Sequence, residues 1–187
     1  MTQRGQWILV IAIVVLLGGG LLAGLALSPV LTPVGVQSDA PNFRAVDIVS
    51  LDTVDLGQLA GDVVLLNIWA TWCAPCEAEM PSIQRLYDEL GPEGLKVMAV
   101  SVDRTETDGV REWIDERGLT FPVYHDQSGR IERAYMTTGV PETFVIDRHG
   151  VIVKKVIGAT EWDNDVQAGL IRRLLDADDD AVENTGG

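Results

Sequence analysis

The sequence predicts an α/β fold in which helices cover both faces of a mixed central sheet. Three observations lead to it. Apolar runs typical of buried strands alternate with segments whose apolar residues recur at helical spacing. Two pairs of short strand-like segments, one early and one late in this series, are joined by turn residues as in hairpins. All of these elements fit within about 140 residues, the size of one compact domain.

An apolar segment precedes the domain. Trp7–Leu27 is an unbroken uncharged run of 21 residues, and as a helix it would cover about 30 Å of hydrocarbon. Arg4 precedes the run and no charge follows it until Asp39. We therefore expect a single-pass anchor in the cell membrane, with a cytoplasmic N-terminus and an extracytoplasmic domain. A cleavable signal peptide ending near 24–26 is the alternative.

Five segments are expected along the chain. Prolines favour an extended tether after the anchor, and the acidic, glycine-ended C-terminus is typical of a disordered tail. The expected segments are a cytoplasmic N-terminus at 1–6, a transmembrane anchor at 7–27, a tether at 28–39, the folded domain at 40–175 and the acidic tail at 176–187. The net charge of -14 makes nucleic acid an unsuitable partner.

The first half of the domain combines a hairpin with alternating strands and helices. Val63–Ala70 is rich in Val, Leu and Ile, as is a parallel strand covered on both faces. The next helix has apolar residues at helical spacing, and Gly91 and Pro92 end it. In chain order we expect a hairpin of Phe43–Val49 and Thr53–Leu56, a strand at Val63–Ala70, a helix at Glu77–Leu90, a strand at Leu95–Val102 and a helix at Asp108–Arg117.

The second half has shorter elements. The turn of its hairpin is Arg148-His149-Gly150, and its final helix has an apolar face. We expect a strand at Phe121–His125, a short helix at Arg130–Met136, paired strands at Thr143–Asp147 and Val151–Ile157, and a helix at Asp163–Leu175.

Cys73 and Cys76, the only cysteines of the chain, form one Cys-x-x-Cys where the first central strand meets a helix. Pro75 suits the first helical turn, because its missing N–H would have had no partner there. The helix N-terminus then stabilises the Cys73 thiolate, and such thiolates have pKa values of about 3.5 to 7.5. We expect Cys73 to be the nucleophile and Cys76 the resolving thiol of a redox-active disulfide.

Three other interpretations compete for these cysteines. A structural disulfide closing so short a loop removes little unfolded-state entropy. A zinc site needs about four ligands, and His125 and His149 lie far along the chain. Two inert buried cysteines would not need Pro75 between them or tryptophans beside them.

The segment Asn67–Pro81 closely resembles the active-site segment of membrane-anchored thioredoxin-like proteins of the TlpA, ResA and CcmG (DsbE) group. Ala40–Phe43 resembles the entry segment of that family, Gly139–Asp147 its cis-proline segment, and 102–136 its central strand-helix insertion. The resemblance covers 40–175. It implies a thioredoxin-like fold with an N-terminal hairpin, and dithiol chemistry without a metal or organic cofactor.

The resemblance also implies roles around the cysteines. Pro141 matches a cis-proline beside the pair, where an extended partner peptide can bind. Glu79 matches a glutamate near the cysteines, and a partly buried carboxyl there could exchange protons with Cys76. Its alternative is a solvated helix carboxylate. Asn67 replaces the buried aspartate of ordinary thioredoxins, which shifts any proton-carrier role toward Glu79.

Three further residues are expected to contact the substrate. Trp72 should pack over the disulfide and offer a contact surface, with Val140 beside it. Glu142 follows the proline and would add negative potential that selects partners. The alternative for Glu142 is a loop carboxylate that faces water.

The resemblance implies a reductant supplied with electrons by a transmembrane protein of the CcdA or DsbD type. The oxidised Cys-x-x-Cys-His of apocytochrome c is the substrate it favours. A copper-site protein or another extracytoplasmic disulfide is the runner-up. A thiol peroxidase shares the fold, but the Pro-x-x-x-Thr-x-x-Cys of such enzymes is absent before Cys73. Copper or zinc carriage by Cys73 and Cys76 is the non-catalytic alternative.

Overall fold

The computed structural model describes residues 7, 11, 13–20 and 34–177. The chain divides into two units, Met1–Pro33 and Val34–Gly187. In the first unit, 13–20 is helical. Within the parts of the chain that are described, no helix combines the length and apolar character needed to cross a membrane. The predicted N-terminus at 1–6, most of the predicted anchor at 7–27, the first half of the predicted tether at 28–39, and all but the first two residues of the predicted tail at 176–187 lie outside the described residues.

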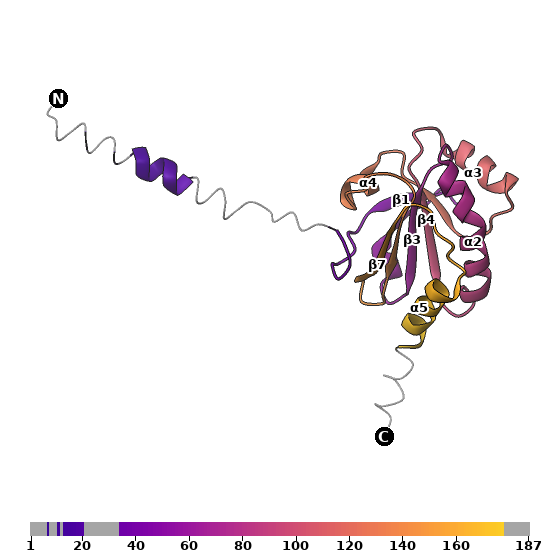
Figure 1. Ribbon diagram of the computed structural model, residues 1–187. Helices are drawn as coiled ribbons and strands as arrows, with labels where there is room; N and C mark the ends of the chain where they lie inside the picture. Colours follow the sequence, from indigo (N-terminus) through magenta and orange to yellow (C-terminus); the bar gives the residue numbers. More distant parts are fainter. Residues whose placement is uncertain (1–6, 8–10, 12, 21–33, 178–187) are drawn as a thin grey trace, which may run out of the picture. The chain divides into compact units, whose positions relative to one another are not determined.

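The second unit is built on one seven-stranded sheet with the strand order β2-β1-β5-β4-β3-β6-β7 (Figure 1). The strands are β1 at Arg44–Asp47, β2 at Thr53–Asp55, β3 at Val64–Trp69, β4 at Lys96–Ser101, β5 at Val123–His125, β6 at Glu142–Ile146 and β7 at Ile152–Ile157. Strands β3, β4 and β5 are mutually parallel, and the other neighbours pair antiparallel. The carboxyl ends of β3, β4 and β5 therefore meet at one edge, which we call the upper edge of the sheet.

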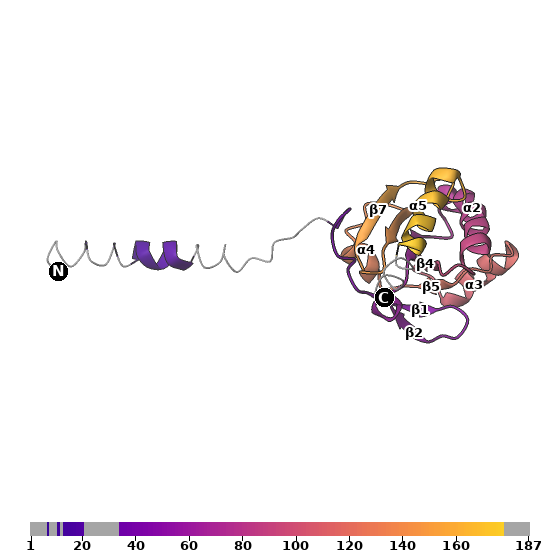
Figure 2. The same cartoon turned by 90° about the horizontal axis from the view of Figure 1, so that it is seen from below.

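Helices cover both faces of this sheet, as the sequence predicts (Figures 1 and 2). They are a 3-10 helix η1 at Leu56–Leu59, α2 at Ala74–Leu90, α3 at Thr107–Glu116, α4 at Arg130–Ala134 and α5 at Asp165–Asp176. Helices α3 and α5 lie beside α2 on one face, where Arg117 pairs with Glu77 at 2.9 Å and Arg172 pairs with Glu89. Helix α4 lies on the other face.

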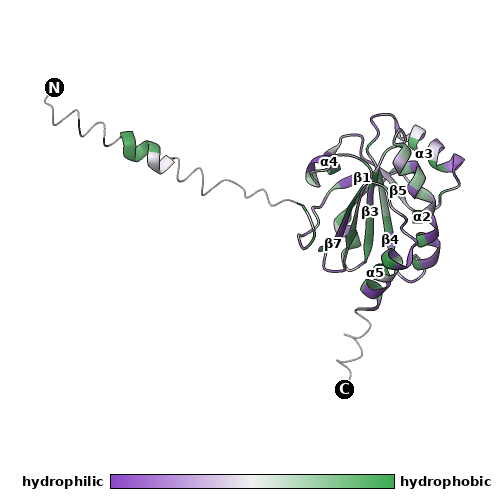
Figure 3. Cartoon of the chain, viewed as in Figure 1, coloured by the Kyte–Doolittle hydropathy of each residue, from purple (hydrophilic) through white to green (hydrophobic). Residues whose placement is uncertain are grey.

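Strand β3 is the centre of the core, because all six of its residues are buried. Its side chains alternate between the two faces, so both faces need apolar cover. On the α2 face, Trp69 packs against Trp113 of α3, with ring centroids 4.9 Å apart. On the α4 face, Tyr135 packs against Phe144 of β6 at 4.8 Å. Figure 3 shows hydrophobic residues along the central strands and hydrophilic ones on the outer sides of the helices.

Most predicted boundaries differ from the observed ones by one or two residues. The largest difference is at the start of α2, which begins at Ala74 rather than at Glu77 because Cys73 is its N-cap. The helix predicted at Arg130–Met136 ends at Ala134, because Met136 adopts a φ of 53° that a helix cannot accommodate. The second strand of the first hairpin ends at Asp55, where the 3-10 helix η1 begins. That helix was not predicted.

Candidate active site

Cys73 and Cys76 are joined by a disulfide at the start of α2, with an S–S distance of 2.07 Å. Cys73 is the N-cap of the helix, and Pro75 occupies its first turn, as predicted. The backbone N–H of Cys76 donates to the Cys73 sulfur at 3.1 Å. Such a donor favours the anionic form of a sulfur, so it would stabilise the Cys73 thiolate when the pair is reduced. Cys76 is fully buried, whereas Cys73 keeps some exposure, which suits a nucleophile and a shielded resolving thiol.

The loop before β6 lies against the Cys73 sulfur. The Val140–Pro141 peptide bond is cis, and the carbonyl oxygen of Val140 lies 3.5 Å from the Cys73 sulfur. The carbonyl oxygen of Pro141 accepts the N–H of Gly158 at 2.8 Å, which ties this loop to the end of β7. The structure thus brings Val140 and Pro141 to the cysteine pair from 67 residues away in the chain.

Trp72 is 70% exposed and lies directly before Cys73 in the chain. An aromatic side chain so placed offers apolar area that a partner can bury. Ile157 at the end of β7 is also exposed, and it lies opposite Glu142 in the pairing of β6 with β7. The substrate-contact roles of Trp72 and Val140 stay predictions.

Glu79 is only 2% exposed, so the solvated-carboxylate alternative is wrong. One of its oxygens accepts from the Asn67 amide at 2.8 Å, and the other accepts from the Thr160 backbone N–H at 3.2 Å. Burial raises the pKa of Glu79 to about 7, although both hydrogen bonds oppose that shift. Because Glu79 lies three residues after Cys76, the two side chains share one side of α2. A carboxyl whose pKa is about 7 thus lies on the same side of α2 as Cys76.

Asn67 holds Glu79 in place from β3. The same Asn67 amide nitrogen donates to the Thr143 hydroxyl at 2.8 Å. These hydrogen bonds join β3, α2 and β6, and Thr160 adds the loop before α5. An amide cannot take up a proton at neutral pH, so of these two side chains only Glu79 is able to exchange a proton, and its role as proton carrier stays a prediction.

A small cavity connects Glu79 with the surface. It measures about 180 Å³ and is lined by Ala78, Glu79, Ala159, Thr160 and Glu161. Such a cavity is large enough for water, which could exchange protons with the carboxyl.

Glu142 lies on the opposite face of the sheet from Glu79. Thr143 points toward Asn67 on the α2 face, so Glu142 next to it points toward the α4 face. It is 1% exposed, and its carboxylate pairs with the Lys155 ammonium at 2.7 Å. The alternative of a water-facing loop carboxylate is therefore wrong. Lys155 offsets the charge that Glu142 would place near the disulfide. That Glu142 selects partners stays a prediction.

Asp103 belongs to the site and was not identified from the sequence. It is 1% exposed, and its carboxylate accepts from the Thr71 backbone N–H at 2.9 Å, the Thr71 hydroxyl at 2.6 Å and the Ser101 hydroxyl at 2.7 Å. These bonds hold the loop that leads into Trp72 and Cys73. A usable signal was present, since polar residues directly after β4 must meet the loop after β3 at the upper edge.

His125 extends this network toward β5. Its Nε2 lies 2.9 Å from the Asp103 carbonyl oxygen and its Nδ1 lies 3.0 Å from the Thr107 hydroxyl. A carbonyl can only accept, so Nε2 carries the proton and Nδ1 accepts from Thr107 in the neutral ring. His125 thus has a structural partner at each nitrogen.

The chain is similar to known redox proteins across this domain. The model of the AhpC/TSA family matches residues 36–155. The thiol-disulfide oxidoreductase ResA of Oceanobacillus iheyensis is 45% identical over 131 residues, which are 68% of each chain. ResA of Geobacillus kaustophilus is 36% identical over 139 residues, covering 74% of this chain and 78% of the relative. A Chlorobium tepidum crystal structure assigned as the thiol:disulfide interchange protein DsbE superimposes with a TM-score of 0.67 at 28% identity, over 75% of this chain and 96% of that one.

Proposed function

This chain belongs to the AhpC/TSA family and is a thiol-disulfide oxidoreductase of the TlpA, ResA and CcmG (DsbE) group, and on that premise we propose that it reduces disulfides of other proteins outside the cytoplasm. The favoured substrate is the oxidised Cys-x-x-Cys-His of apocytochrome c. One observation carries the proposal: a disulfide at a helix start lies beside a buried carboxyl whose pKa is about 7.

The proposed reaction starts from the reduced enzyme. The Cys73 thiolate attacks one sulfur of the partner's disulfide, which breaks and releases the partner's other sulfur as a thiolate. Cys76 then gives its proton to the Glu79 carboxylate, and the Cys76 thiolate attacks the Cys73 sulfur. That step forms the Cys73–Cys76 disulfide and releases the partner's second thiolate. Two electrons pass to the partner, and its thiolates take protons from water.

The enzyme must then be reduced again. We propose a transmembrane donor of the CcdA or DsbD type, which returns two electrons to the Cys73–Cys76 disulfide. Glu79 returns its proton to Cys76 or to water in the cavity beside it. The charge asymmetry around Trp7–Leu27 supports a single-pass membrane anchor with the N-terminus in the cytoplasm.

Trapping identifies the substrate. In the native host, the Cys76→Ser variant keeps Cys73 able to attack a partner but lacks the thiol that releases the partner, so mixed disulfides accumulate. Cys73→Ser is the matched control, because it lacks the nucleophile. We expect apocytochrome c among the proteins trapped on Cys73 and absent from the control. A trapped set without any cytochrome, from cells that are making cytochrome c, would contradict this substrate, and a copper-site protein in its place would support the runner-up.

A further inference from the structure

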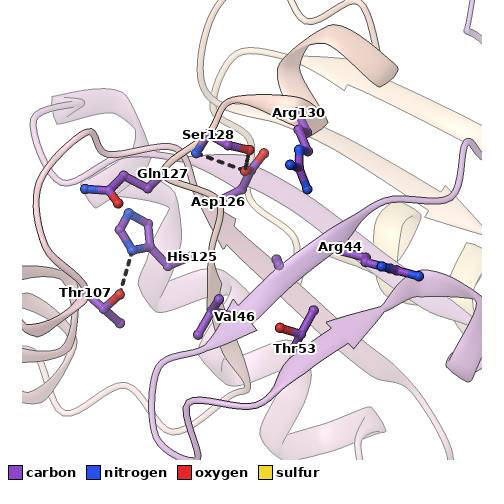
Figure 4. Close-up of a pocket in the computed structure, with 10 residues that line it drawn as sticks. Arg44, Val46, Thr53, Thr107, His125, Asp126, Gln127, Ser128 and Arg130 are labelled. Carbon is purple, nitrogen blue, oxygen red and sulfur yellow. Dashed lines mark hydrogen bonds between the residues drawn. The ribbon is translucent and has the colours of Figure 1, made fainter.

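A cavity of about 610 Å³ lies beyond the carboxyl end of β5 (Figure 4). Strands β1 and β2 and helix α4 contribute to its walls, and the side chains that matter most are Arg44, Thr53, Thr107, His125, Ser128 and Arg130. The volume lies within the range of about 300 to 1,000 Å³ that is usual for ligand sites. It is large for a bare ion and suits a side chain with its flanking backbone.

Two arginines of the cavity have unused binding capacity. Among residues 34–177, the Arg130 guanidinium forms no hydrogen bond and no ion pair. In Figure 4 its side chain extends from α4 toward β1. Arg44, on that strand, has one ion pair, in which its Nε lies 3.9 Å from Asp55. By comparison, Arg85 and Arg104 pair with carboxylates at 2.5 and 2.6 Å.

The carboxylate in the cavity wall is already occupied. Asp126 is buried, and one of its oxygens accepts from the Ser128 N–H and hydroxyl at 3.1 and 2.5 Å. Its other oxygen accepts from the Ile131 N–H at 2.7 Å. The lining of the cavity thus holds two arginines and one internally bonded carboxylate, in a chain whose net charge is -14. An incoming carboxylate would meet favourable charge in this cavity.

The cavity and the disulfide open at the same edge of the sheet. Cys73 follows β3 and His125 ends β5, with β4 between them. Neighbouring strands are about 4.8 Å apart, so the ends of β3 and β5 are about 10 Å apart. An extended peptide covers that distance in about three to four residues. His125 also joins the cavity wall to Asp103, which holds the loop before Cys73.

We propose that this cavity binds a glutamate or aspartate side chain of the protein whose disulfide is reduced, about three to six residues from the reactive cysteine of that protein. Arg130 and Arg44 bind the carboxylate. The identity of the partner as a disulfide substrate rests on the proposed function. The cavity adds a recognition element outside the cysteine pair.

The test uses the reduced full-length chain and two peptide disulfides that differ only in Glu or Gln four residues from the cysteine. The uncharged 2-hydroxyethyl disulfide reports exchange without docking. We expect the Glu peptide to react about three- to tenfold faster than the Gln peptide, with a difference that shrinks at high salt. Arg130→Gln and Arg44→Gln should reduce this preference. Arg173→Gln on α5 is the matched control, and it should keep the preference.

The outcomes separate the two proposals. The cavity proposal is overturned if 2-hydroxyethyl disulfide is reduced but the Glu and Gln peptides react at equal rates. It is also overturned if both Arg130→Gln and Arg44→Gln keep the preference for the Glu peptide. A chain that reduces none of the three disulfides overturns the proposed function itself. Glutarate at millimolar concentration should slow the Glu peptide alone, and slowing of both peptides would count against a carboxylate site in this cavity.

Discussion

Glu79 and Glu142 are both buried near the disulfide, but on opposite faces of the sheet and with opposite partners. Neutral amide groups of Asn67 and Thr160 donate to Glu79, whereas the ammonium of Lys155 pairs with Glu142. Burial without a neighbouring cation raises the pKa of Glu79, whereas Glu142 has a cationic partner that compensates its charge. The difference teaches that burial near the disulfide does not by itself tell which carboxyl is suited to exchange protons, because the partners of each carboxyl decide it.

The largest expected effect is on the pH dependence of stability. The pKa of Glu79 is about 7 in the folded chain, against 4.5 for an ordinary glutamate. Between these values the folded state binds a proton that the unfolded state has lost, so stability decreases as the pH rises from 4.5 to 7. Wild type should lose about 3 kcal/mol more than Glu79→Gln over this window. Urea unfolding of both proteins at several pH values measures this difference. If the free energies of unfolding of wild type and Glu79→Gln change in parallel with pH, the prediction is contradicted.

Removing the cation beside Glu142 is the next largest change. Lys155→Met should leave a buried, unpaired carboxylate and lower the free energy of unfolding by about 2 to 3 kcal/mol. The double variant Lys155→Met with Glu142→Gln should recover most of that loss, because the buried charge is gone. Denaturant unfolding at pH 7 compares the variants. If Lys155→Met is as stable as wild type, the ion pair does not have the role assigned to it.

The kinetic prediction concerns proton transfer. Glu79→Gln should slow release of the partner from Cys73 about 10- to 100-fold at pH 7.5, since the base for Cys76 is lost. In wild type, this step should accelerate as the pH rises through about 7, and in the variant this inflection should vanish. Stopped-flow exchange with a peptide disulfide measures both. Glu77→Gln, an exposed change on the same helix, should retain the wild-type profile. An unchanged profile in Glu79→Gln would end the proton-carrier role.

The smallest expected effect comes from Asn67→Ala. This change removes a hydrogen bond that lowers the pKa of Glu79, so the inflection of the exchange rate should move to higher pH. The direction is the test, since a shift to lower pH would mean that Asn67 does not favour the ionised carboxyl. Comparison with Thr143→Val, which loses only the second partner of Asn67, separates direct from indirect effects.

Local signals made the strands, helices and cysteines predictable. An apolar run followed by Pro75 marks the junction of β3 and α2, where the Cys-x-x-Cys lies. Gly91 marks the end of α2. Asp103 was missed because its partner Thr71 is 32 residues away, so its role depends on how β3 and β4 pair.

The sequence by itself determined the alternation of strands and helices, the reactive cysteine pair and the family, because each is encoded in residues close together in the chain. Only the tertiary structure decided that Glu79 is buried among amides while Glu142 meets Lys155, and that Arg44 and Arg130 share one cavity. The physical reason is that burial and counter-charge depend on contacts between distant segments. The bond between Glu79 and Thr160, for example, spans 81 residues.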